Sequence, residues 1–180
     1  MLQGPTGVVI DDRDKRRDEG RARLAAPPEI AVRRAGLSDA PEVARLLHDF
    51  NTEYSEPTPG IEFLTDRTRH LLANGEMTVL LAGERPDGLV LIRFRPSIWS
   101  AALDAYLEEF YVVPELRGQG IGRALLETAM ETARQAGATR MDLGTSVADT
   151  AAIGLYESFG FTNREGGPDG PRMLFYERDL

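Results

Sequence analysis

The chain has 180 residues, of which 42% are hydrophobic and 28% charged, a composition typical of one globular domain with a substantial core. Its lack of cysteine excludes disulfides, thiolate metal sites and a cysteine nucleophile, and two histidines offer little material for a metal cluster. The net charge of −8 argues against nucleic-acid binding, and no run of about 18 apolar residues predicts a membrane span. We therefore expect a cytoplasmic protein that binds no metal, nucleic acid or membrane.

Residues 1–28 are predicted to form a disordered tail. A mixed run of charges covers 11–23, and Ala25-Ala26-Pro27-Pro28 closes it. Such a segment buries too little apolar surface to offset the entropy lost on ordering. The domain is therefore placed at 29–180.

The domain is predicted to begin with one strand and two helices. The strand covers 30–34, and the first helix opens at Ser38-Asp39-Ala40-Pro41, which supplies capping residues and a proline in the first turn. Two prolines within 51–60 end this helix. The second helix covers 61–72 and ends before Asn74-Gly75.

A β-hairpin is predicted next. Residues 77–82 and 89–95 have the composition of strands, and Arg85-Pro86-Asp87-Gly88 between them is typical of a tight turn. The loop that follows, at 96–102, carries the only tryptophan, Trp99.

The glycine-rich stretch at 117–122 lies between a predicted strand and a predicted helix. The strand covers 103–113, which is rich in aromatic and β-branched residues. The helix has apolar residues at helical spacing, namely Ile121, Leu125, Ala129 and Ala133. Such a loop directs several backbone N–H groups toward one point at a helix N-terminus, where phosphate oxygens bind. Glycine is required because a Cβ would block the approach of the backbone.

The last third of the chain is predicted to hold another strand, a short helix and a final pair of strands. These elements are expected at 140–144, 152–159, 161–162 and 173–178. The complete order of elements is therefore β-α-α-β-β-β-α-β-α-β-β.

Two well-known phosphate loops are excluded by the residues around Gly120. A Walker loop requires Gly-Lys-Ser/Thr, whereas Gly122 is followed by Arg123 and Ala124. A Rossmann fingerprint that began at Gly118 would need its third glycine at position 123. The remaining pattern, Arg-x-x-Gly-x-Gly after a strand that ends in Val-Val-Pro, resembles the pyrophosphate loop of the GCN5-related N-acetyltransferase (GNAT) superfamily, which binds acetyl-coenzyme A.

A second motif strengthens this resemblance. Residues 149–161 read Asp-Thr-Ala-Ala-Ile-Gly-Leu-Tyr-Glu-Ser-Phe-Gly-Phe, similar to the GNAT signature Asn-x-x-Ala-x-x-Leu-Tyr-x-x-x-Gly-Phe. Asp149 replaces the usual asparagine, and a carboxylate cannot donate a hydrogen bond to the pantetheine arm as an amide can. Asp149 can still cap the helix that follows it.

The resemblance covers about 29–180 and implies an α+β (α/β) GNAT fold. In that fold helices flank a mixed central sheet that splays open after the fourth strand, with acetyl-coenzyme A in the opening and the amine entering from the other side. The expected cofactor-binding residues are Val112, Val113, Arg117, Gly118, Gln119, Gly120, Ile121, Gly122, Arg123, Asp149 and Tyr156. Val112 and Val113 would line the pantetheine through their backbone groups, and Arg117 would add a cation at the rim of the loop.

Acetyl transfer to an amine requires a base for the ammonium proton, donors for the carbonyl oxygen and an acid for the departing thiolate. Tyr156 is the candidate acid because a phenol can donate to the thiolate, and the alternative is that it belongs only to the core. Glu108 and Glu109 are the candidate bases, and because adjacent strand residues point to opposite faces, at most one should face the substrate.

The stretch Leu107-Glu108-Glu109-Phe110-Tyr111-Val112 resembles a strand of the diamine acetyltransferases, in which the first of two acids faces the amine. Glu108 is therefore preferred over Glu109. The alternative is that the acid pairs with Arg93 or Arg95. The loops at 51–60 and around Trp99 are expected to shape the acceptor site, where Glu53, Tyr54 and Glu56 either attract a cation or are solvated.

We interpret the chain as an enzyme that moves the acetyl group of acetyl-coenzyme A directly to a primary amine, in a ternary complex. A small amine or polyamine is the preferred acceptor, and a protein N-terminus or an amino-sugar antibiotic is the alternative. A catalytically inert acyl-coenzyme A-binding module is a further alternative. The sequence leaves the oligomeric state open, a homodimer included.

Overall fold

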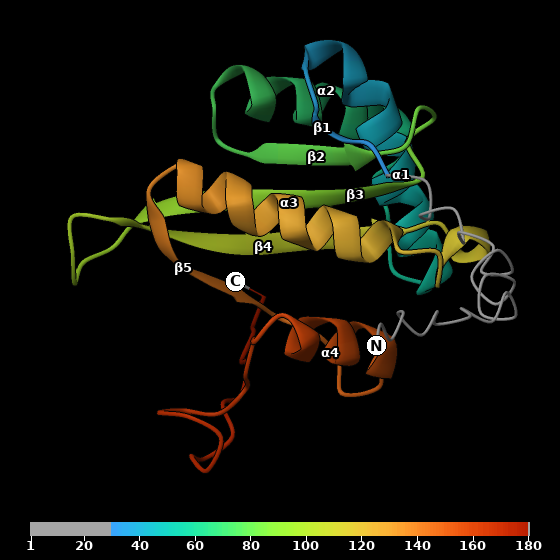
Figure 1. Ribbon diagram of the computed structural model, residues 1–180. Helices are drawn as coiled ribbons and strands as arrows, with labels where there is room; N and C mark the ends of the chain where they lie inside the picture. The colour runs from blue at the N-terminus through green and yellow to red at the C-terminus, as the bar shows by residue number, and fades with distance from the viewer. Residues whose placement is uncertain (1–29, 180) are drawn as a thin grey trace, which may run out of the picture.

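The computed structural model describes residues 30–179 and shows one mixed β-sheet with helices on both faces (Figure 1). The strands lie side by side in chain order: β1 (Val32–Arg34), β2 (Thr78–Ala82), β3 (Gly88–Pro96), β4 (Leu103–Val112) and β5 (Ala138–Leu143). The first four strands pair antiparallel, whereas β5 runs parallel to β4. A parallel neighbour requires a crossover connection, and α3 (Ile121–Gln135) supplies it.

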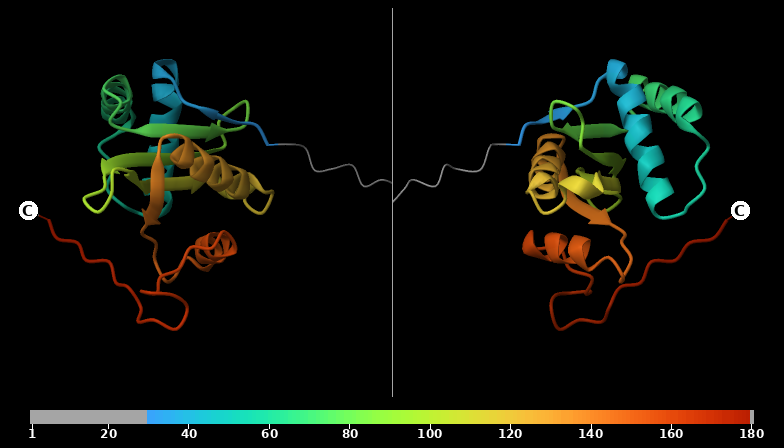
Figure 2. Two further views of the ribbon diagram at one scale, coloured as in Figure 1. Left: turned by 60° about the vertical axis from the view of Figure 1, so that its left-hand side comes forward. Right: turned by 90° about the vertical axis from the view of Figure 1, so that its right-hand side faces the viewer.

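Two layers of helix enclose the sheet (Figure 2). On one face lie α1 (Ala40–Glu53) and α2 (Ile61–Ala73), and on the other lies α3. Each layer has its own apolar core, the first around Val43 and Leu46 of α1 and the second around Leu125 of α3. All five residues of β2 are buried between the layers, and the four after Thr78 are apolar.

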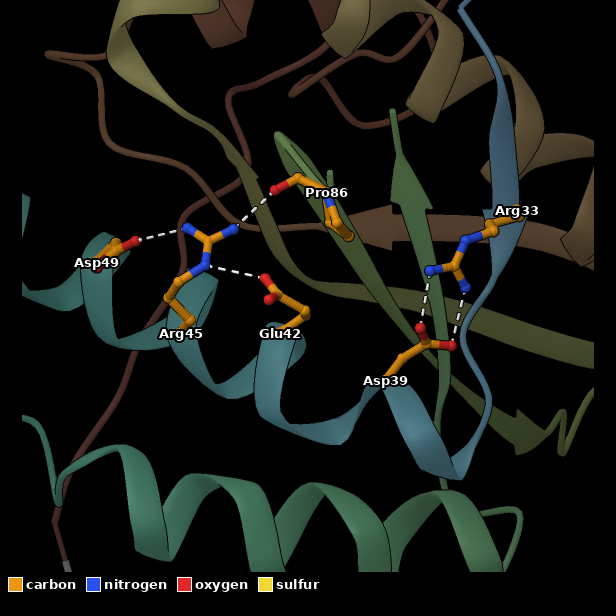
Figure 3. Close-up of polar contacts among 6 residues, drawn as sticks. All are labelled: Arg33, Asp39, Glu42, Arg45, Asp49 and Pro86. Atoms are coloured by element: carbon orange, nitrogen blue, oxygen red, sulfur yellow. Dashed lines mark hydrogen bonds and ion pairs between the residues drawn. The ribbon is translucent and has the colours of Figure 1, made fainter. Parts of the chain in front are cut away.

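Polar contacts hold α1 against the sheet along its length (Figure 3). At its start, Arg33 of β1 donates two hydrogen bonds to Asp39, at 2.7 and 2.8 Å. In its middle, Arg45 donates to the carbonyl oxygen of Pro86 in the β2–β3 turn at 2.8 Å. The Arg45 guanidinium also forms ion pairs with Glu42 and Asp49 of the same helix. These contacts give α1 a defined position over β1 and the turn.

A β-bulge lies in the middle of β4. Leu91 pairs with Glu109, and the next residue of β3 pairs with Leu107, which leaves Glu108 as an extra residue in β4. The bulge shifts the alternation of side chains, so that Leu107 and Phe110 both pack in the core on the α3 side. Glu109 lies on the opposite face with its partner Leu91, whose side chain belongs to the α1–α2 core.

β4 and β5 separate halfway along β4. Their parallel pairing ends at Leu107 and Leu143, whereas β4 continues to Val112. Within residues 30–179, the edge of β4 beyond Leu107 therefore has no strand partner on the β5 side. This opening confirms the expected α+β fold, in which a mixed sheet splays after the fourth strand.

The prediction of a final strand pair at 161–162 and 173–178 is wrong. An isolated bridge joins Arg164 and Arg172, and the residues that follow belong to no strand. Leu174 and Tyr176 are 71% and 84% exposed. Their β-propensity predicted a strand, but propensity produces one only where a neighbouring strand accepts the backbone hydrogen bonds.

Two further expectations concern the N-terminal tail and membrane-spanning helices. The predicted tail at 1–28 lies outside the described residues. None of the helices in the described part of the chain is long and apolar enough to cross a membrane.

Candidate active site

A cavity of about 660 Å³ lies where β4 and β5 separate. Its walls come from the second half of β4, the glycine loop, the turn after β5, the helix α4 (Thr150–Ser158) and the end of α1. The lining includes most of the predicted site residues: Glu108, Glu109, Val112, Arg117, Gly118, Gly120, Gly122, Arg123, Asp149 and Tyr156. The fold therefore brings together the two motifs and the strand with the two glutamates.

The glycine loop presents a row of backbone N–H groups. Within the described residues, the N–H groups of positions 118–123 have no backbone acceptor, and α3 begins immediately after Gly120. Gly118 and Gly120 have φ angles of 76° and 91°, a backbone conformation that side chains with a Cβ rarely adopt. The free N–H groups at a helix N-terminus carry partial positive charge, so the loop is suited to bind phosphate oxygens.

Gly122 has a different role, in packing. A Cβ on Gly122 would lie 3.3 Å from Cδ2 of Leu155 and 3.5 Å from Cζ of Phe110. The absence of a side chain therefore allows the start of α3 to approach α4 and β4 closely. All three of these residues line the cavity.

The Arg117 side chain is bound by protein groups. It donates two hydrogen bonds to the Glu53 carboxylate, at 2.6 and 2.7 Å, and one from Nε to the Val112 carbonyl oxygen at 2.9 Å. Its guanidinium also lies over the Tyr111 ring, 5.7 Å from the centroid. Arg123, in the first turn of α3, lies over the ring of Phe159 at 5.0 Å. The expected cation at the rim of the loop is thus paired with a carboxylate.

Val112 and Val113, whose backbone groups are predicted to line the pantetheine, already make hydrogen bonds within the protein. The Val113 N–H donates to the Asp87 carbonyl oxygen at 2.9 Å, and Val113 does not line the cavity. The Val112 carbonyl accepts the bond from Arg117, although a carbonyl oxygen can accept a second one. Asp149 caps α4 by accepting from the Ala152 N–H at 3.0 Å, as the sequence suggested.

Tyr156 belongs both to the core and to the cavity wall. Only 7% of its surface is exposed, and its ring lies 6.0 Å from the centroids of both Phe110 and Phe161. Burial, with a smaller contribution from the charge of Asp149, raises the pKa of the Tyr156 phenol above its ordinary value. The hydroxyl therefore keeps its proton at neutral pH and can act as a donor.

Glu108 and Glu109 both line the cavity. Glu108 is the extra residue of the bulge, so the strict alternation from which the orientation of these two residues was predicted is interrupted here. The Glu108 carboxylate forms an ion pair with Arg93. Burial, and secondly the charge of Glu108, raises the pKa of Glu109 to about 7.

One side of the cavity is lined by residues from the end of α1 and the loop after it. Tyr54 and Glu56, two of the predicted acceptor residues, line it, whereas Glu53 is paired with Arg117. Trp99 is 92% exposed at the β3–β4 turn and does not line the cavity. Sequence reasoning missed the turn at 144–146, whose position after β5, at the opening of the sheet, could have indicated it.

Comparisons with known proteins agree with this arrangement. Residues 41–161 match the sequence model of the acetyltransferase (GNAT) family. YhfO of Bacillus subtilis (strain 168), named as an uncharacterized N-acetyltransferase, is 31% identical over 140 residues, which are 75% of this chain and 91% of YhfO. The thialysine N-epsilon-acetyltransferase of Bos taurus is 26% identical over 155 residues, covering 76% of this chain and 88% of the bovine protein. A crystal structure of a protein from Arthrobacter sp. FB24 has 45% identity and a TM-score of 0.77, covering 83% of this chain and 96% of that one.

Proposed function

Because this chain belongs to the acetyltransferase (GNAT) family, an acetyl-transferring class of enzymes, we propose that it acetylates the primary amine of a small cationic molecule such as a diamine or polyamine. Acetyl-coenzyme A is the cosubstrate that this family implies. The observation that carries the proposal is a single cavity that holds a carboxyl group with a pKa of about 7, a protonated phenol and a row of free N–H groups.

The residues present fit acetyl-coenzyme A. The unpaired N–H groups of 118–123 match the need of a pyrophosphate for several donors at one point. The cavity then continues from this loop along the open edge of β4 to Tyr156, a path suited to an extended pantetheine arm. The acetyl donor would supply the electrophilic carbonyl, and the protein supplies the proton transfers and the alignment.

Glu109 is the proposed general base. A carboxyl group with a pKa of about 7 is partly ionised at neutral pH and is basic enough to take a proton from an ammonium ion, directly or through one water. Glu108 is the second choice because its carboxylate is already paired with Arg93. Its charge has an indirect effect, since it helps to raise the pKa of Glu109.

Tyr156 is the proposed general acid. Burial keeps its hydroxyl protonated, and the residue lines the same cavity as the two glutamates. A proton from the phenol would neutralise the departing thiolate. The amine would attack the thioester directly, so the reaction requires no covalent enzyme intermediate.

The preference for a small cation rests on two observations. Glu56, Glu108 and Glu109 line the cavity, and carboxylates attract an ammonium ion. The bovine relative is named for acetylating the amine of thialysine, a small cationic molecule. We therefore place the acceptor among small amines.

A panel of amines with detection of free thiol tests the proposal. Diamines and polyamines should release coenzyme A faster than a peptide N-terminus or an aminoglycoside does. Activity on peptides or aminoglycosides with none on any small amine would replace the proposed acceptor. If no amine of the panel leads to release of free thiol, the assignment as an N-acetyltransferase is contradicted.

A further inference from the structure

Glu53, at the C-terminal end of α1, makes a contact that the proposed chemistry does not use. Its carboxylate receives two hydrogen bonds from Arg117, at 2.6 and 2.7 Å, across a separation of 64 residues. Glu53 is only 28% exposed and Arg117 42% exposed, so the pair is shielded in part from water. Paired, parallel bonds of this kind are stronger than single ones and fix the plane of the guanidinium.

Three different parts of the protein contact the Arg117 side chain. Its two terminal nitrogens bind Glu53, its Nε binds the Val112 carbonyl oxygen, and its face covers the Tyr111 ring. The bond to Val112 closes the turn from the end of β4 back onto the first residue of the glycine loop. Gly118 and the N–H groups after it follow this turn directly in the chain.

The other partner of the pair is also fixed. α1 is attached to β1 through Arg33 and Asp39, and to the β2–β3 turn through Arg45 and Pro86 (Figure 3). Phe50, one turn before Glu53, packs against Tyr111 with ring centroids 5.6 Å apart. Glu53 is therefore presented from a rigid helix.

We propose that Glu53 is a positioning residue for acetyl-coenzyme A, which acts by holding Arg117 and, through it, the glycine loop in the shape that receives the pyrophosphate. This inference rests on the proposed use of acetyl-coenzyme A. It differs from the simpler electrostatic expectation, in which a carboxylate beside a phosphate site weakens binding by competing for the arginine. The two expectations predict opposite signs when the charge of Glu53 is removed.

The contacts favour positioning over competition. Release of Arg117 toward a phosphate would break three bonds and a contact with an aromatic ring, while leaving the Glu53 carboxylate partly buried without a partner. The N–H groups of the loop are free to bind phosphate without any such rearrangement. The arginine therefore contributes most by staying where it is.

Calorimetric titration of the full chain with acetyl-coenzyme A tests this role. Glu53→Gln keeps the size of the side chain, and we expect it to raise the Kd by about three- to tenfold, the scale of one partly exposed charged pair. The KM for acetyl-coenzyme A should rise by the same factor, with kcat at saturation unchanged. Arg117→Lys retains the charge but loses the paired geometry, and the double variant should bind no more weakly than the weaker single variant.

Glu42→Gln is the matched control, because Glu42 forms an ion pair with Arg45 on the same helix but lies outside the cavity. Its Kd should equal that of the wild type, and both glutamine variants should have similar Tm values. A Kd that is unchanged or lower in Glu53→Gln would overturn the positioning role. A wild-type protein that does not bind acetyl-coenzyme A would overturn the proposed function, and this inference with it.

Discussion

Replacement of Glu109 by glutamine should make the protein more stable at alkaline pH. The pKa of this carboxyl is raised from 4.5 to about 7 in the folded state, so the folded protein binds its proton more tightly than the unfolded chain does. The stabilisation that follows is fully present below pH 4.5 and is lost as the pH rises through about 7. Above pH 7 the folded protein therefore carries the cost of a half-buried negative charge.

The magnitude follows from the two pKa values. At about 1.4 kcal/mol per pKa unit, the full effect is about 3 kcal/mol, of which most is lost between pH 5 and pH 8. Glutamine does not titrate. The difference in the free energy of unfolding between Glu109→Gln and the wild type should therefore change by about 2 to 3 kcal/mol in favour of the variant over this interval.

Urea denaturation of both proteins at pH 5 and pH 8 measures this difference. The comparison with the variant cancels the titration of all other carboxyl groups. Glu108→Gln is a useful second variant, because the loss of its charge should lower the pKa of Glu109 and reduce the effect. A difference between Glu109→Gln and wild type that is the same at both pH values would refute the reasoning.

Three further predictions concern ligand binding and turnover. Gly120→Val should weaken acetyl-coenzyme A binding in calorimetry, because Gly120 has a φ of 91° and supplies part of the N–H row; unchanged affinity in a folded variant would count against the pyrophosphate site. Tyr156→Phe should lower kcat by roughly 10²- to 10⁴-fold while changing stability by about 1 kcal/mol at most, and full kcat would exclude the acid role. Rising salt should raise the KM for a diamine if Glu56 and its neighbours attract it, which steady-state kinetics at several salt concentrations will show; a KM independent of salt would contradict the attraction.

The local motifs could be recognised from the sequence. The glycine loop and the segment at 149–161 each lie within one short stretch of chain, and both contribute residues to the wall of one cavity. The capping role of Asp149 was predictable for the same reason, since its partner Ala152 is three residues away. In each case the physical requirement lies inside one stretch of chain.

The register of β4 could not be read in this way. Strict alternation assigns Glu108 and Glu109 to opposite faces, and only the pairing with β3 reveals the extra residue. A bulge depends on the partner strand, which the sequence of β4 alone does not contain. The preference for Glu108 over Glu109 rested on the resemblance to a strand of the diamine acetyltransferases, and that resemblance does not reveal the bulge either.

Contacts between distant segments were also beyond the sequence. Glu53 and Arg117 were each singled out, but for separate roles, because nothing in the sequence shows that the end of α1 meets the glycine loop. The prediction of a strand at 173–178 was wrong because it also depended on a contact with another segment. Its composition favours a strand, but no strand among the described residues pairs with it.

The most direct test of the proposed transfer is the pH dependence of kcat/KM with the best amine of the panel, measured for the wild type and Glu109→Gln. The proposal predicts a wild-type profile that rises through about pH 7 as Glu109 loses its proton. In Glu109→Gln this rise should disappear, with kcat/KM lower by about 10²-fold and recovering only at high pH, where free amine accumulates. A variant that retains the rise near pH 7 and the activity of the wild type would contradict the assignment of Glu109 as the base.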